Sequence, residues 1–219
     1  MKLLLTSAGI TNQAIADGLQ QLVGKPFEET SVLFIPTAAN FEVGDKSWLV
    51  DNINELHDLK LKSFDMIDIA GLPEKLWLPQ LQAADVICFG GGDNAYLARI
   101  LREHGMKEKL QKMDDSKVYM GISAGSMVAG VPLPTGMDQE LFVEGNFESD
   151  DCEGLALCDF SFIPHLNSAH FTKINTEVLD SMQDRLINTT YATDDHTAIA
   201  VVNDEIEIIG EGETWKLIK

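Results

Sequence analysis

Short apolar runs alternate with amphipathic stretches along the first half of the chain. The runs end at turn residues and predict buried strands, which occupy 2–7, 31–36, 85–92 and 117–123. The intervening stretches repeat apolar positions at helical spacing and predict helices over 11–24, 45–59, 73–83, 93–104 and 106–115. Strands that alternate with helices favour an α/β fold with a mostly parallel sheet sandwiched by helices.

The pattern loosens after residue 130. Residues 131–159 are rich in Gly, Pro, Asp and Glu and predict a loop, before a short apolar run at 160–164 and a helical stretch over 168–186. Further strands are predicted at 191–195, 197–202, 205–210 and 214–219. Turn residues separate the last three, which predicts a C-terminal antiparallel hairpin. Because no linker divides the chain, we expect residues 1–219 to form a single domain.

Charge and cysteine content narrow the choice of partners. Sixteen basic residues against thirty-five acidic ones give a formal charge of −19, which disfavours nucleic acid and anionic membranes as partners. The opening MKLLLTSAGI is too short and too quickly polar for a secretory leader. Cys88, Cys152 and Cys158 form neither an even disulfide set nor a metal-ligand spacing. These features favour a cytoplasmic protein without metal or cofactor, as a monomer or homodimer.

A Gly-x-Ser-x-Gly motif ends the run at 117–123. Ser123 lies between Gly121 and Gly125, and helix-compatible residues follow. Small neighbours allow the sharp turn from strand to helix that exposes a nucleophilic serine above the edge of a sheet. The motif is weak alone, because short patterns of small residues arise by chance.

Three glycines, Gly90 to Gly92, end another predicted strand and are followed by Asp93 and Asn94. A phosphate loop would need a Lys-Ser/Thr pair after the last glycine, and a dinucleotide fingerprint would need a different glycine spacing. A tight turn without a functional role remains an alternative interpretation of the three glycines. We favour an oxyanion hole, in which the amides of Gly91 or Gly92 and of Ala124 stabilise a tetrahedral oxyanion.

A serine nucleophile needs a base and a carboxylate that orients it. Of the histidines, His165 has the strand-end position that the edge of an open α/β sheet favours, whereas His170 is ambiguous. Asp194 and Asp195 end a later strand, and only one can face the crevice because side chains alternate along a strand. We prefer Asp195, with Asp138 as the rival carboxylate. The order serine, histidine, aspartate argues against an α/β-hydrolase, in which the acid precedes the histidine.

Four ordered motifs together resemble the dipeptidase E (aspartyl dipeptidase) and cyanophycinase family. They are GGGDNAYL, GISAGS, the PH of FIPHLNS, and TDDHTAI, and the similarity spans most of the chain. The resemblance implies a serine peptidase on the class I glutamine amidotransferase-like fold, with Ser123 as nucleophile, His165 as base and the glycines at 90–92 as oxyanion loop. It also implies a role for Asp138 in holding the α-amino group of a substrate.

The chain departs from that family pattern at two places. Asp195 stands where the family commonly has glutamate, so the histidine must lie closer to the backbone of the acid. The segment after the histidine carries basic residues in aspartyl dipeptidases, and here it offers only Lys173 before Arg185. This scarcity weakens the case for amino-terminal aspartate as the preferred substrate residue. We assign Lys173, with Asp93 and Asn94, to substrate binding.

Our leading hypothesis is a serine exopeptidase that hydrolyses short peptides, with amino-terminal acidic residues as one candidate class. Ser123, His165 and Asp195 form its triad. One alternative is a binding or regulatory module of the same fold that has lost turnover because Asp195 is too short. Another is an esterase or amidase, because acyl transfer uses the same groups with other leaving groups. Phe41 and Glu42, after the second strand, are candidates to line the pocket or simply a loop.

Overall fold

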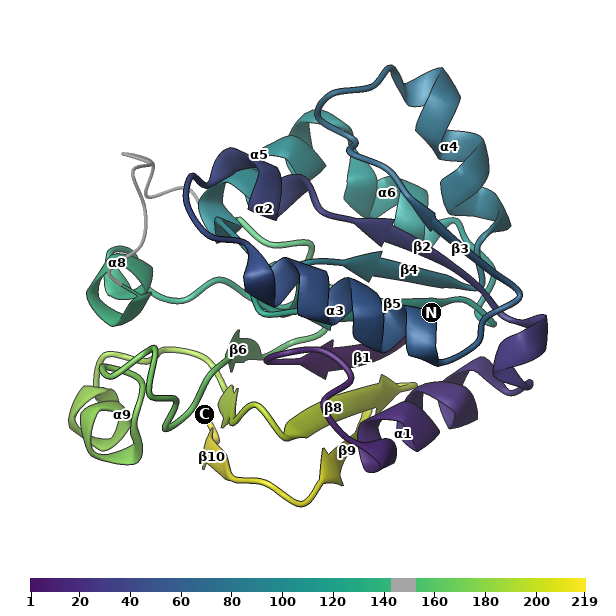
Figure 1. Cartoon of the computed structure of the whole chain (residues 1–219). Helices are drawn as coiled ribbons and strands as arrows, with labels where there is room; N and C mark the ends of the chain where they lie inside the picture. The colour runs from purple at the N-terminus through teal and green to yellow at the C-terminus, as the bar shows by residue number, and fades with distance from the viewer. Residues whose placement is uncertain (143–152) are drawn as a thin grey trace.

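The computed structural model describes residues 1–142 and 153–219, which form a large and a small sheet (Figure 1). The large sheet has the strand order β3-β2-β4-β5-β1-β8-β9. Its members are β1 (Lys2–Thr6), β2 (Ser31–Ile35), β3 (Ser63–Met66), β4 (Val86–Phe89), β5 (Val118–Ile122), β8 (Thr197–Val202) and β9 (Glu205–Gly210). Strands β1 to β5 pair in parallel, whereas β8 runs antiparallel to β1 and β9 to β8. The mostly parallel α/β sheet and the C-terminal hairpin of β8 and β9 are thus confirmed.

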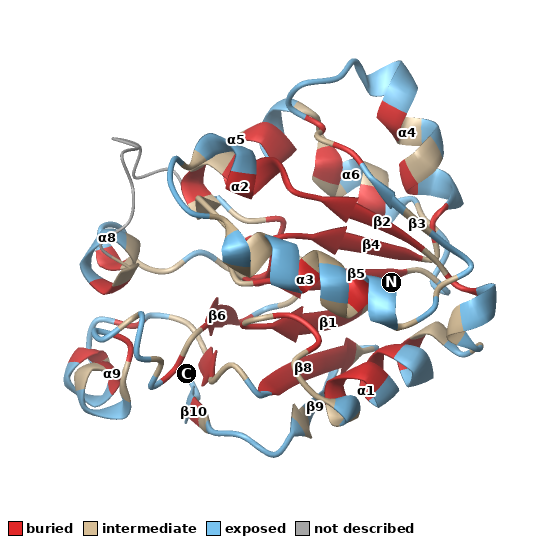
Figure 2. Ribbon diagram, in the orientation of Figure 1, coloured by how far each residue is buried: buried red, intermediate tan, exposed pale blue. Residues whose placement is uncertain are grey.

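Helices cover both faces of this sheet. In Figure 1, α1 (Gln13–Val23) and α3 (Ser47–Asp58) lie on one face, and α4 (Glu74–Ala83), α5 (Asn94–Glu103) and α6 (Met106–Gln111) lie on the other. A hydrophobic core lies on each face of the sheet, and alternate residues of β1 point into the two cores. Leu4 packs with α1, and Leu3 and Leu5 pack toward α5 and α6. Burial on both faces explains why these strands are continuous apolar runs (Figure 2).

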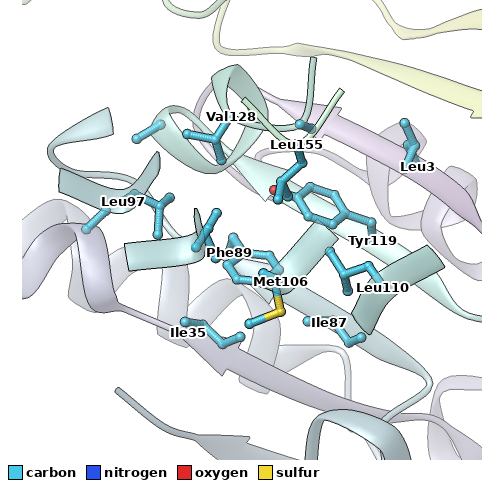
Figure 3. Packing of buried hydrophobic residues seen from close by; sticks show 14 of the residues in the cluster. Leu3, Ile35, Ile87, Phe89, Leu97, Met106, Leu110, Tyr119, Val128 and Leu155 are labelled. Carbon is cyan, nitrogen blue, oxygen red and sulfur yellow. The ribbon is translucent and has the colours of Figure 1, made fainter. Parts of the chain in front are cut away.

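Two stacked aromatic rings anchor the strands that lead to the serine turn. Phe89 on β4 and Tyr119 on β5 are fully buried and stack with ring centroids 5.1 Å apart (Figure 3). The Tyr119 hydroxyl donates a 2.6 Å hydrogen bond to the carbonyl of Gly125, just past the serine. This bond satisfies the buried hydroxyl and ties the turn to the core.

The small sheet has its own core. Strands β6 (Ser161–Ile163) and β7 (Thr190–Thr193) are parallel, and β10 (Thr214–Leu217) runs antiparallel to β7. Helices α8 (Met137–Phe142) and α9 (Thr176–Met182) lie near this sheet (Figure 1). Trp215 of β10 packs in this core and donates a 2.8 Å hydrogen bond from its indole to Asp180 of α9.

The structure differs from the sequence-based prediction at the C-terminus. Strand β10 leaves the predicted hairpin to pair with β7, because Trp215 finds its apolar partners there. The backbones of Asp194 and Glu213 hydrogen-bond beside the start of β10. The helix predicted over 168–186 is confined to α9.

Short elements were also missed. Helix α8 lies within the predicted loop 131–159, of which residues 143–152, Cys152 included, fall outside the described part of the chain. Strand β3, α2 (Thr37–Phe41) and the 3₁₀ turn Phe27–Glu29 are too short or too polar to give a periodic signal. The helix expected directly after Ser123 is present as α7 (Ala124–Met127). Within residues 1–142 and 153–219, no helix combines the length and the apolar character that crossing a bilayer requires.

Candidate active site

Ser123 sits at the carboxyl end of β5, in a backbone conformation that few side chains adopt. Its φ is +50° and its ψ is −111°, and the short helix α7 follows directly. The neighbouring glycines make room for this turn. A Cβ atom on Gly125 would lie 2.0 Å from the Phe89 carbonyl oxygen, and one on Gly121 would lie 2.6 Å from the backbone of Ser126. The strain at Ser123 therefore coexists with packing that only glycine permits.

His165 and Asp195 approach Ser123 from the small sheet. His165 follows β6 after Pro164, and Asp195 follows β7. The His165 Nε2 atom lies 2.9 Å from the Ser123 Oγ atom, and its Nδ1 atom lies 2.7 Å from Asp195 Oδ1. With the ring proton on Nδ1, that nitrogen donates to Asp195 and Nε2 accepts the serine proton. The three side chains that the sequence nominated form one hydrogen-bonded chain.

The rival acids make other contacts. The Asp194 carboxylate accepts backbone N–H groups of His196 and Glu213 at 3.0 and 2.8 Å, so it stabilises its own turn. Asp138 accepts a 2.8 Å hydrogen bond from the Asn94 side-chain amide. His165 thus contacts Asp195 rather than either alternative.

The Asp195 carboxyl group stays ionised well into the acid range. Burial raises its pKa, but hydrogen bonds from His165 and Ser168 and the charges of His165 and His196 outweigh burial and lower the pKa below its ordinary value. A carboxylate that is ionised at neutral pH can hold the imidazole in one tautomer and stabilise the imidazolium when it forms.

The segment after β1 connects the two sheets at the site, and sequence reasoning missed this contribution. The backbone N–H of His165 donates to Ser7 Oγ at 3.1 Å, and the same hydroxyl donates to the Thr193 carbonyl at 2.8 Å. Thr11 donates to the carbonyl of Asp195 at 2.7 Å. Serine and threonine after a strand are common turn residues, so nothing in the sequence pattern indicated this role.

An aromatic ring also positions the imidazole. The Phe171 ring stacks on His165 with centroids 4.3 Å apart and planes 11° from parallel. Phe142 meets Phe171 edge-on at 6.0 Å. His165 itself has a φ of +65°, a left-handed conformation, so stacking and hydrogen bonds must compensate for local strain.

The glycine loop lies beside the serine. A Cβ atom on Gly91 would come within 3.3 Å of the Ser123 Cβ atom and 3.4 Å of the Trp48 ring. Gly92 has a φ of +127°, and a Cβ there would lie 2.4 Å from the backbone of α2. Glycine is therefore required at position 92, and a side chain at position 91 would be tightly packed against Ser123 and Trp48. Ala124, on the other side of Ser123, begins α7, which has only one turn.

A cavity of about 890 Å³ opens onto Ser123 and His165. Its wall includes Gly91, Gly92, Asp93 and Asn94 of the glycine loop and, as the sequence suggested, Phe41 and Glu42. The Asp93 carboxylate also caps α5 by accepting the Tyr96 N–H at 2.7 Å.

Two of the predicted substrate-binding residues lie outside this wall. Asp138 accepts a hydrogen bond from Asn94, which belongs to the wall, and Lys173 lies near Glu140, whose pKa its charge helps to lower after the larger effect of Arg185. Among residues 1–142 and 153–219, no group of three His, Cys, Asp or Glu side chains could hold a metal ion.

The sequence is similar to a peptidase family model and to individual peptidases. Residues 3–209 match the model of peptidase family S51. Peptidase E of Haemophilus influenzae (strain PittGG) is 29% identical over 140 residues, which cover 60% of this chain and 56% of that protein. The match thus spans little more than half the length of that relative. An uncharacterised peptidase of Listeria monocytogenes is 25% identical over 179 residues, 80% of this chain and 84% of that protein.

Two solved structures share the fold. A crystal structure of a putative peptidase E from Listeria monocytogenes has a TM-score of 0.74 at 23% identity, covering 96% of this chain and 98% of that one. A peptidase from an acI-B1 Actinobacterium has a TM-score of 0.70 at 20% identity, covering 99% and 93%. The match to the family model spans nearly the whole chain, and the chain therefore belongs to serine peptidase family S51.

Proposed function

We propose that this protein is a serine exopeptidase that hydrolyses short peptides through Ser123, His165 and Asp195. The observation that carries the proposal is the continuous hydrogen-bonded chain, with 2.9 Å between Ser123 Oγ and His165 Nε2 and 2.7 Å between His165 Nδ1 and Asp195 Oδ1. Both distances lie within the reach that proton transfer requires.

The reaction follows from this geometry. The Ser123 oxygen attacks the carbonyl carbon of the peptide bond while its proton passes to His165 Nε2. The tetrahedral intermediate then collapses: the C–N bond breaks and His165 returns the proton to the leaving amine. A water molecule, deprotonated by the same nitrogen, attacks the acyl-enzyme and releases the acid product with Ser123 restored.

An oxyanion hole beside Ser123 completes the proposed mechanism. The closeness of Gly91 to the Ser123 Cβ supports a role for the amides of Gly91 or Gly92, with the amide of Ala124 on the other side. Each donor of this kind contributes on the order of 3 kcal/mol to transition-state stabilisation. The single turn of α7 adds little dipole, so we assign this work to the individual N–H groups.

The size of the cavity favours short substrates. Sites for small molecules enclose about 300–1,000 Å³, and a cavity of about 890 Å³ falls within that range. Asp93 and Asn94 line it and are proposed to bind the substrate, with Asp138 orienting Asn94 through their 2.8 Å hydrogen bond.

The contacts of Asp195 favour an active enzyme over a module without turnover. If the aspartate side chain were too short to contact the base, His165 Nδ1 would lack a carboxylate partner. Asp195 Oδ1 instead lies 2.7 Å from His165 Nδ1, so a longer acidic side chain is not needed. The strained backbone of Ser123 also suits a catalytic role, since such strain is found mainly at functional sites.

Hydrolysis of a dipeptide panel tests the proposal. We expect the parent protein to release free amino acids and Ser123→Ala to lose turnover by several orders of magnitude. The control is Ser181→Ala, which removes an exposed hydroxyl on α9 outside the cavity and should leave the rate unchanged. Equal hydrolysis by the parent and Ser123→Ala would contradict the proposal.

A further inference from the structure

The wall of the cavity is strongly acidic. Besides Asp195, which is paired with His165, four carboxylates line it: Glu42, Asp45, Asp51 and Asp93. Glu42 and Asp45 lie between α2 and α3, Asp51 lies on α3, and Asp93 ends the glycine loop. Hydrogen bonds from neutral groups, such as Ser47 to Asp45 and the Tyr96 N–H to Asp93, leave the negative charges in place.

Balancing cations are scarce at this wall. No lysine or arginine of residues 1–142 and 153–219 belongs to it. The remaining segment, 143–152, reads VEGNFESDDC and contains neither residue type. Lys46 lies between two wall residues, Asp45 and Ser47, but its ammonium group donates to the backbone carbonyls of Ala39 and Glu42 at 2.6 and 2.8 Å. Its single positive charge offsets only one of the four negative charges.

Aromatic side chains share the wall with these carboxylates. Phe41, Trp48, Phe142 and Phe171 all line the cavity, and Phe41 is held by stacking on Tyr96 at 4.3 Å. Aromatic faces accommodate the methylene stem of lysine or arginine and attract its charged end. The aromatic side chains are an observation separate from the negative charge of the wall. Rings and carboxylates together suit a cationic ligand.

We propose that the cavity selects peptides by positive charge, binding an amino-terminal lysine or arginine residue and disfavouring amino-terminal aspartate or glutamate. The proposal rests on the peptidase function proposed above, and it reverses the acidic preference that the sequence raised as one candidate. Its physical basis is simple: a carboxylate entering this cavity is repelled by four others, whereas an ammonium or guanidinium group is attracted.

Three dipeptides of similar length test the selection. We expect kcat/KM to fall in the order Lys-Leu, Gln-Leu, Glu-Leu, with about tenfold or more between the first and the last at low ionic strength. The gap should shrink at high salt, because the charges near the opening are screened. Equal rates, or faster cleavage of Glu-Leu, would overturn the proposal.

A matched pair of variants locates the effect. Asp51→Asn removes a carboxylate of the wall and should reduce the Lys-Leu to Glu-Leu ratio about threefold. Asp58→Asn makes the same change on the same helix, at a side chain that is 84% exposed and outside the cavity, and should leave the ratio unchanged. Equal effects of the two variants would overturn the assignment to the cavity wall.

The same experiments separate this inference from the proposed function. Loss of turnover in Ser123→Ala together with faster cleavage of Glu-Leu would keep the peptidase and overturn the charge selection. If no dipeptide is cleaved, protection of Ser123 from a fluorophosphonate probe replaces the rate as the readout. Stronger protection by Lys-Leu than by Glu-Leu then supports charge selection, and equal or weaker protection overturns it.

Discussion

Ser123, His165 and Asp195 illustrate how single residues depend on their surroundings. Two of them, Ser123 and His165, have positive φ values of 50° and 65°. Such conformations cost on the order of 1–3 kcal/mol each for ordinary residues. Hydrogen bonds from neighbouring residues, including that of the His165 backbone to Ser7, hold them in place. The cost is localised where the proposed chemistry needs fixed geometry.

The two adjacent aspartates allow a direct test at this scale. Asp195→Asn removes the negative charge beside His165 and can stabilise the wrong tautomer, so we expect kcat to fall about 10³–10⁴-fold. Asp194→Asn alters only a turn that accepts N–H groups, so kcat should stay within a few fold. Steady-state kinetics of both variants make the comparison, and similar losses in both would contradict the assignment.

Phe171 offers a second test at this scale. Phe171→Leu keeps an apolar side chain but removes the ring that stacks on His165. We expect kcat to fall about 3–10-fold, which corresponds to the usual energy of an aromatic pair, with a smaller change in KM. Measuring kcat and KM separately tests a positioning role. A change in KM alone would mean that the ring only contacts substrate.

At the scale of elements, the turn between β5 and α7 is fixed by its packing against β4. Tyr119 bonds to the Gly125 carbonyl, and Gly125 lies so close to Phe89 that no side chain fits. A Gly-x-Ser-x-Gly motif therefore reflects close approach of two strands and a helix as well as the conformation of the serine.

Substitution of this glycine should destabilise the protein. Gly125→Ala places a methyl group 2.0 Å from the Phe89 carbonyl oxygen, so we expect the free energy of unfolding to fall by about 1–3 kcal/mol or more. Gly71→Ala is the control, since its nearest neighbour would lie 3.6 Å away, in ordinary contact. Urea unfolding measures both, and equal stability of the two variants would contradict the packing account.

Cys88, which is buried on β4, and Cys158, which is partly buried in a loop, give a pH-dependent prediction. Burial raises the pKa of Cys88 on β4 beyond the usual range and the pKa of Cys158 to about 12. Because the thiolate is the reactive form, both should alkylate slowly at pH 8 and faster only as the pH rises or the protein unfolds. Peptide mapping after iodoacetamide treatment checks this. Rapid labelling of either peptide in the native protein would contradict it.

For the whole molecule, the apolar runs and their alternation with helices predicted the parallel sheet correctly. The reason is physical: strands such as β4 and β5 are buried on both faces, so every position is apolar. The partner of β10 was not predictable, because the same alternating strand fits either sheet and the choice depends on where Trp215 is buried.

The candidate site was nominated from strand ends, where the carboxyl edges of strands meet. That rule, together with the Gly-x-Ser-x-Gly motif around Ser123, identified Ser123, His165 and Asp195 without any contact information. It could not reveal Phe171 or Ser7, because their roles come from a stacked ring and a backbone hydrogen bond across 158 residues of chain. The charge of the cavity was also hidden, since its carboxylates are dispersed among the many acidic residues of the sequence.

Covalent labelling tests the central claim most directly. Ser123 should react with a fluorophosphonate probe because His165 removes its proton, so mass mapping of the treated protein should place the adduct on Ser123. In His165→Gln the labelling rate should fall by orders of magnitude while the protein stays folded by circular dichroism. A parent protein that acquires no adduct on Ser123, or a folded His165→Gln variant that labels as fast as the parent, would contradict the account.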